Sequence, residues 1–186
     1  MFIDVLPNVR RLTAKEGGAN MSTPGWISAW GTLLAALCCA PATATDLSVI
    51  EKWTGEYPST KIVNDKPLWD QPEIQSAMRA AMGQYFLEFS QKTTHTPDAP
   101  VQSDGNGLYG AWSCTNADDC GGNQMIAYFN SPAGIAQVCW RNSAGEGGAV
   151  QDLWLANGKA RLLPLNGCGA GQRDPFAPLR RFGGGS

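Results

Sequence analysis

The clearest pattern in the chain is a run of apolar residues at helical spacing over residues 71–90. Apolar side chains recur every three or four positions, which places them on one face of an α-helix. Asp70 followed three residues later by Glu73 resembles a capping box, and Pro72 is tolerated in a first helical turn. The pattern predicts one main helix that lays this face on a core. Its apolar positions are Ile74, Ala77, Met78, Ala81, Met82, Tyr85, Phe86 and Phe89.

A polar, turn-rich stretch follows the helix, and beyond it the chain consists of short β-like runs separated by turn residues. Asn157-Gly158 is a strong hairpin signal, because a type I′ turn needs positive φ at both central residues. Ser131–Gly134 predicts a second reversal. One helix followed by consecutive hairpins predicts an α+β fold, in which four to five antiparallel strands form a meander packed against the helix. The predicted strands are residues 108–113, 124–130, 135–141, 150–156 and 159–165.

The N-terminal part of the chain has the pattern of an export signal. An apolar run from Trp26 ends in the small residues Ala42-Thr43-Ala44, which is typical of a signal peptide and its cleavage site. The sequence therefore predicts a signal region over residues 1–44, with Met1 or Met21 as the true start. The run is shorter than the roughly 20 apolar residues of a membrane span.

Three segments follow from this division. Residues 45–168 are expected to form a single domain, and residues 169–186 a flexible tail. A lipid anchor on Cys38 or Cys39 is disfavoured, because Leu37 and Cys38 precede them where a lipobox needs a small residue. The expected location of the mature protein is the periplasm.

Composition excludes some classes of partner. The whole chain has a formal net charge of −2, and the part after residue 44 retains 11 basic and 14 acidic side chains. This slightly acidic balance does not favour nucleic acid or an anionic membrane as a partner. The sequence does not distinguish a monomer from a homodimer.

Four cysteines remain after cleavage, an even number suited to an oxidising compartment. Of the three possible connectivities, the spacing favours Cys114–Cys120 as a local clasp and Cys139–Cys168 as a tie between distant segments. A zinc site is disfavoured, because the Cys-x5-Cys interval and a single histidine do not match the usual ligand spacing. We expect two disulfides and no metal.

Candidate catalytic residues are few. The chain has no nucleophile elbow, no phosphate-binding glycine loop and no His/Glu metal motif. The neighbouring carboxylates of Asp118 and Asp119 do not suit a glycosidase, whose two carboxylates face each other across the substrate. His95 lies in a polar loop and is expected to be solvated. We expect a binding protein without a cofactor, not an enzyme.

The most distinctive segment is the polar loop between the first two long strands, which comprises Cys114, Thr115, Asn116, Ala117, Asp118, Asp119 and Cys120. A disulfide that orders a loop beforehand lowers the entropic penalty of binding. With the preceding helix and the following strand, this loop resembles that of the periplasmic inhibitors of vertebrate-type lysozyme, in which a Cys-Lys-Pro-His-Asp-Cys loop enters the cleft of the enzyme. The resemblance covers roughly residues 53–168 and rests on Asp119-Cys120-Gly121 and the position of the loop.

The resemblance implies an inhibitor that plugs the active-site cleft of a cell-wall hydrolase through Asn116, Asp118 and Asp119. The interval between the cysteines is one residue longer than in the family, and Asp118 occupies the position of the inserting histidine. An acidic tip would meet two carboxylates in a lysozyme cleft, whereas a cleft with His, Lys or Arg would attract it. The target could thus be a lysozyme or an amidase, the latter implying an immunity protein. The alternative is a non-catalytic envelope module that binds glycan or peptide through Trp112, Tyr128, Trp140 and Trp154.

Overall fold

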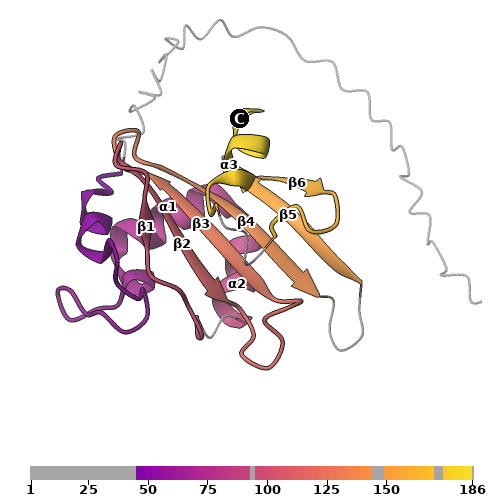
Figure 1. Ribbon diagram of the computed structural model, residues 1–186, viewed down its shortest axis with the longest axis horizontal. Helices are drawn as coiled ribbons and strands as arrows, with labels where there is room; N and C mark the ends of the chain where they lie inside the picture. Colours follow the sequence, from indigo (N-terminus) through magenta and orange to yellow (C-terminus); the bar gives the residue numbers. More distant parts are fainter. Residues whose placement is uncertain (1–44, 93–94, 144–148, 170–173, 186) are drawn as a thin grey trace, which may run out of the picture. The chain divides into compact units, whose positions relative to one another are not determined.

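The computed structural model describes residues 45–92, 95–143, 149–169 and 174–185. The predicted export signal, residues 1–44, lies outside this part of the chain. Within the described part, six antiparallel strands form one sheet in which every strand pairs with its neighbour in sequence (Figure 1). The strands are β1 (Gln102–Ser103), β2 (Leu108–Cys114), β3 (Gln124–Asn130), β4 (Ile135–Ser143), β5 (Val150–Ala156) and β6 (Lys159–Leu163).

The meander is built on the turns that the sequence predicts. Asn157 and Gly158, with φ of 51° and 70°, join β5 to β6 and bring Ala156 opposite Lys159. Gly134, in the turn between β3 and β4, also has a positive φ of 64°. The prediction of four to five strands was too low. The added strand, β1, is only two residues long, too short for an alternating pattern to reveal it.

The predicted single helix over residues 71–90 is instead two helices, α1 (Pro72–Met82) and α2 (Tyr85–Lys92). The break falls at Gly83, whose φ of 56° is left-handed. A Cβ atom at Gly83 would lie 2.8 Å from the carbonyl oxygen of Gly158, so the close contact between the helix and the β5–β6 turn requires glycine. The apolar stripe itself packs against the core as predicted.

The start of α1 also differs from the prediction. Asp70 belongs to a preceding 3-10 helix, η2 (Leu68–Asp70), and Gln71 is the N-cap residue. The Gln71 side chain does not cap the helix. Its Nε2 donates to the carbonyl oxygens of Val63 at 2.7 Å and Lys66 at 2.9 Å, and so holds the preceding turn against the helix start. The predicted capping box at Asp70 and Glu73 is therefore wrong.

Each face of the sheet has its own core. Met125, Ala127 and Phe129 of β3 point to the face covered by α1, α2 and the 3-10 helix η1 (Ser48–Trp53). The alternate residues Ile126 and Tyr128 point to the opposite face, where they join a second, smaller cluster. Figure 1 shows α1 and α2 behind the sheet and the C-terminal helix in front of it.

The C-terminal segment builds the second core. It contains α3 (Ala177–Phe182) and the 3-10 helix η3 (Gly183–Gly185). The Phe176 ring is buried above Gly110, and the Tyr128 hydroxyl donates to the Pro175 carbonyl oxygen at 2.8 Å. The sequence predicted a flexible tail after residue 168, whereas the described residues 174–185 pack on the sheet.

Both predicted disulfides are present. Cys114 and Cys120, with Cα atoms 5.1 Å apart, close the loop between β2 and β3. Cys139 on β4 is joined to Cys168, which follows β6, across a Cα–Cα distance of 5.4 Å. Two disulfides indicate an oxidising environment outside the cytoplasm. Of the helices in the described ranges, none has the length and apolar character of a membrane span.

Candidate functional site

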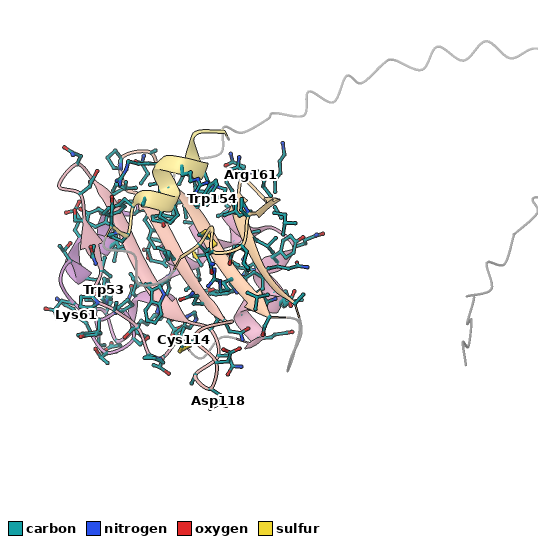
Figure 2. The ribbon with its side chains drawn as sticks, turned by 45° about the vertical axis from the view of Figure 1, so that its right-hand side comes forward. Trp53, Lys61, Cys114, Asp118, Trp154 and Arg161 are labelled. Carbon is teal, nitrogen blue, oxygen red and sulfur yellow. A yellow bond between two sulfur atoms is a disulfide. The ribbon has the colours of Figure 1, made fainter. Side chains whose placement is uncertain are left out.

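The clasped loop lies at one end of the sheet, where β2 ends and β3 begins. Figure 2 shows Asp118 at the outer limit of this end, and Trp154 and Arg161 at the other. Cys114 is buried at the end of β2, and Cys120 is partly exposed. The disulfide therefore joins the loop to a buried strand position.

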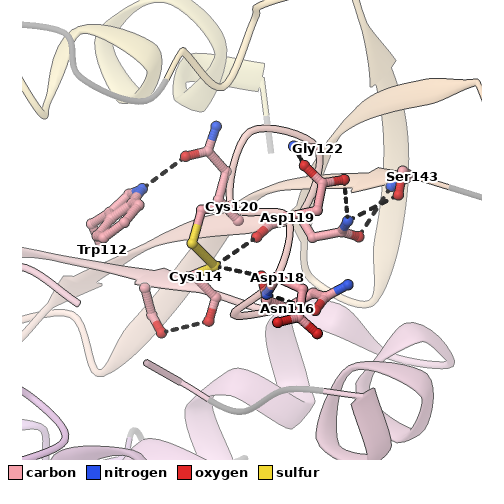
Figure 3. Close-up of a disulfide and its surroundings, with 11 residues drawn as sticks. Trp112, Cys114, Asn116, Asp118, Asp119, Cys120, Gly122 and Ser143 are labelled. Carbon is pink, nitrogen blue, oxygen red and sulfur yellow. Dashed lines mark hydrogen bonds between the residues drawn. A yellow bond between two sulfur atoms is a disulfide. The ribbon is translucent and has the colours of Figure 1, made fainter. Parts of the chain in front are cut away.

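Hydrogen bonds inside the loop fix its shape (Figure 3). The Asp119 carboxylate accepts the N–H of Gly122 at 2.9 Å and the side-chain amide of Asn123 at 3.0 Å. The Asn123 N–H donates to the Asp119 carbonyl oxygen at 2.9 Å. A Cβ atom at residue 122 would lie 2.5 Å from the Asp119 carboxylate, so a larger residue there would displace this carboxylate from its hydrogen bonds. Asp119 organises the loop from within.

Asn123 ties the loop to the neighbouring strand. Its side-chain amide donates to the Ser143 hydroxyl at 2.9 Å, and its side-chain oxygen accepts the Ser143 N–H at 3.3 Å. The Thr115 N–H donates to the Asn123 carbonyl oxygen at 2.9 Å. At the base, the Trp112 indole N–H donates to the Gln124 side chain at 3.0 Å. The loop is thus anchored to both β2 and β4.

The tip of the loop consists of Asn116, Ala117 and Asp118, all exposed. The Asn116 side-chain oxygen accepts the Asp118 N–H at 3.2 Å, which fixes the backbone of the turn. Among the described residues, none donates a hydrogen bond to the Asp118 carboxylate. The two adjacent aspartates are both exposed but differ in their partners: the Asp119 carboxylate is hydrogen-bonded within the loop, whereas Asp118 presents an unpaired negative charge to solvent.

A second segment, residues 95–98, supports the base of the loop. The Cys114 N–H donates to the carbonyl oxygen of Pro97 at 2.9 Å, and Asp98 pairs with Ser113 in an isolated bridge. The Asp98 carboxylate accepts the Ser59 N–H at 2.7 Å, so the same segment is also bonded to the turn that contains Ser59. The sequence did not reveal this support, because no periodic pattern marks it.

His95 begins this segment. The sequence analysis predicted a solvated side chain, and this prediction is wrong. Its ring stacks on Trp69 with a centroid distance of 5.1 Å and meets the edge of Phe89 at 5.4 Å. Burial lowers the pKa of His95 to about 4. Its Nδ1 atom is buried without a hydrogen-bond partner. His95 is thus a neutral packing residue that holds the supporting segment against the core.

The aromatic side chains of the alternative binding surface do not form one. Tyr128, Trp140 and Trp154 are at most 4% exposed. Trp140 lies in the core on the α1 side of the sheet, whereas Tyr128 and Trp154 lie on the opposite face. Only Trp112 is partly exposed. This arrangement does not support glycan binding on these four side chains.

One buried polar feature was not predicted. Arg141 and Asp152, opposite each other on β4 and β5, form two hydrogen bonds of 2.7 and 2.8 Å. These hydrogen bonds from the guanidinium to Asp152 raise the pKa of Arg141. Arg141 also donates to the Asn166 side chain at 3.0 Å. The Cys168 N–H donates to the Asp152 carboxylate at 3.4 Å, so the ion pair lies beside the Cys139–Cys168 disulfide and helps to fix the chain after β6.

No metal site is evident in the described ranges. No three His, Cys, Asp or Glu side chains there lie close enough together to hold a metal ion. In comparisons with known proteins, the chain matches no family model, no curated protein and no solved structure.

Proposed function

We propose that the mature protein is a periplasmic inhibitor that binds a cell-wall hydrolase and inserts the Cys114–Cys120 loop into its active-site cleft. The observation that carries this proposal is that different residues fix the shape of the loop and form its exposed tip. The disulfide, Asp119 and Asn123 hold it in one shape, while the tip presents Asp118 without an internal partner. A loop ordered before binding loses little entropy in the complex, which favours insertion into a narrow cleft.

The charge of the tip indicates the kind of cleft. A carboxylate is attracted by His, Lys or Arg and repelled by the paired carboxylates of a lysozyme-type site. An amidase with a cysteine–histidine pair offers a cationic partner of this kind. We therefore favour an amidase over a lysozyme as the target, which would make this chain an immunity protein.

The test is an inhibition assay with residues 45–186 in excess over purified lysozymes and cysteine amidases, read out as release of soluble peptidoglycan fragments. We expect one amidase to be inhibited. Asp118→Asn should raise the inhibition constant about tenfold to a hundredfold, because a hydrogen bond to a charged group contributes roughly 1.5–3 kcal/mol. Asp65→Asn is the matched control, since it removes an exposed aspartate from another turn.

Opening the loop by changing Cys114 and Cys120 to serine should also weaken inhibition, because the three tip side chains become less ordered. The circular dichroism spectra of all variants should match that of the parent. If no enzyme of the panel is inhibited, or if the Asp118 and double-cysteine variants both inhibit as strongly as the parent, the proposal is wrong.

A further inference from the structure

Charge is distributed unevenly along the chain. Residues 45–152 contain six basic and 13 acidic side chains, whereas residues 153–186 contain five basic and a single acidic one, Asp174. Asp174 forms an ion pair with Arg180. The C-terminal part of an acidic protein is therefore cationic. Two of its cations, Lys159 and Arg161, lie on β6, the last strand of the sheet.

β6 has a free edge in the described structure. It pairs with β5 alone, and the residues from Lys159 to Leu162 are exposed. In an antiparallel ladder, alternate residues turn their backbone N–H and C=O groups away from the partner strand. An edge strand of this kind can accept one more strand through main-chain hydrogen bonds.

A groove of about 290 Å³ runs beside this edge, on the face that carries α3. Trp154 and Ala156 of β5 and Phe182 of α3 form its apolar lining, and Lys159 and Arg161 border it. The Arg161 guanidinium donates to the Phe182 carbonyl oxygen and lies 5.7 Å from the centre of the Phe182 ring. Arg161 is thus oriented in advance, whereas Lys159 forms no ion pair with a described residue.

We propose that an extended acidic peptide segment of a partner protein adds to β6 as a seventh strand. Side chains two residues apart point to the same face of a strand, so Lys159 and Arg161 face the groove together. An added strand with carboxylates at alternate positions would place them beside these two cations, and its intervening apolar side chains would lie on the other face, beside Ala160 and the exposed Leu162. A second copy of the chain would bring the same cations to the edge, which opposes self-pairing.

This surface lies at the opposite end of the molecule from Asp118, as Figure 2 shows, so the inference does not depend on the inhibitor proposal. The two sites could be occupied at once. The occupant would be a protein segment recognised by its extended backbone and its alternating negative charge.

The experiment titrates residues 45–186 with a synthetic decapeptide of alternating glutamate and valine, followed by amide NMR shifts. We expect binding at low salt that weakens at high salt, with the largest shifts at Ala160 and Leu162. Lys159→Glu should weaken binding about tenfold, because it places like charges side by side. The matched control, Lys66→Glu, makes the same change in an exposed turn and should bind like the parent.

Three further probes decide between strand addition and simple charge attraction. A peptide of the same length and charge with proline at alternate valine positions cannot form the ladder and should not bind. Inorganic phosphate and vesicles of anionic phospholipid should leave the β6 amides unshifted. The proposal is overturned if the alternating peptide does not bind, if the proline peptide binds equally well, or if the vesicles shift the β6 amides instead.

Discussion

Replacing His95, the only histidine of the chain, tests whether its burial controls stability in mild acid. The ring is held between Trp69 and Phe89, and its backbone has a left-handed φ of 55°. His95→Asn removes the titrating group, and asparagine tolerates this backbone conformation better than most residues. The comparison is made on residues 45–186, where no other histidine titrates.

The expected effect follows from the difference between the two states. The pKa of His95 is about 4 in the folded protein, against 6.5 for an unperturbed histidine. Because the folded-state pKa is the lower one, the unfolded chain takes up the proton first as the pH falls. The stability contribution is therefore complete above pH 6.5 and is lost as the pH falls toward 4. Between pH 7 and pH 5 the loss amounts to about 2 kcal/mol.

The assay is urea unfolding at pH 7, 6 and 5, followed by tryptophan fluorescence. The carboxylates titrate alike in both proteins, so their contribution cancels in the comparison. We expect the parent to lose about 2 kcal/mol more of its unfolding free energy than His95→Asn between pH 7 and pH 5. Parallel pH profiles would refute the assignment of His95 as a partly buried, neutral group.

Two further predictions concern the scaffold. Changing Cys139 and Cys168 to alanine should lower the unfolding free energy by about 3.6 kcal/mol in the chain-entropy model and leave inhibition by the folded protein unchanged, as denaturant titration and the inhibition assay would show. A loss of inhibition in the folded variant would contradict this separation of roles. Gly83→Ala should destabilise the protein by about 2 kcal/mol in thermal melts, more than the control Gly55→Ala. Both glycines have positive φ, but only at Gly83 would the Cβ atom meet another chain segment; equal losses would show that this contact is unimportant.

The sheet could be predicted from sequence because its signals are local. Strand alternation and turn residues such as Asn157-Gly158 act within a few positions, and the five longer strands lie where the pattern predicted them. The break at Gly83 could not be found in the same way. A glycine inside a helical pattern is often tolerated, and this one ends α1 because Gly158, distant in sequence, packs against it.

The second core was missed for a similar reason. Phe176, Leu179 and Phe182 are spaced three residues apart, but they stand among glycine, proline and arginine, at the N-cap and within a helix of only six residues. Such a helix is not stable alone and forms because it covers Tyr128 and Trp154. Its existence depends on the sheet face beneath it, which a reading of one segment does not reveal.

At the candidate site, cysteine spacing predicted the clasp, but residue type did not separate Asp118 from Asp119. Only the hydrogen bonds of the folded loop make the distinction, because the carboxylate of Asp119 accepts hydrogen bonds from Gly122 and Asn123. Substitutions of the two aspartates should therefore have different effects. Asn at position 118 changes the contact with a target, whereas Asn at position 119 changes the shape of the loop.

This arrangement also sets the effect of opening the clasp. Without the disulfide, the Asp119 hydrogen bonds and the Asn123–Ser143 contacts still restrain the loop. The backbone N–H of residue 114 also still donates to the carbonyl oxygen of Pro97. The added entropy is then confined mainly to the three tip residues. Of these, only Asn116 and Asp118 have side-chain rotamers to lose, so at about 0.5–1.5 kcal/mol for each the loss of affinity should be nearer tenfold than a thousandfold. A larger loss would mean that the clasp, and not the hydrogen-bonded network, determines the shape of the loop.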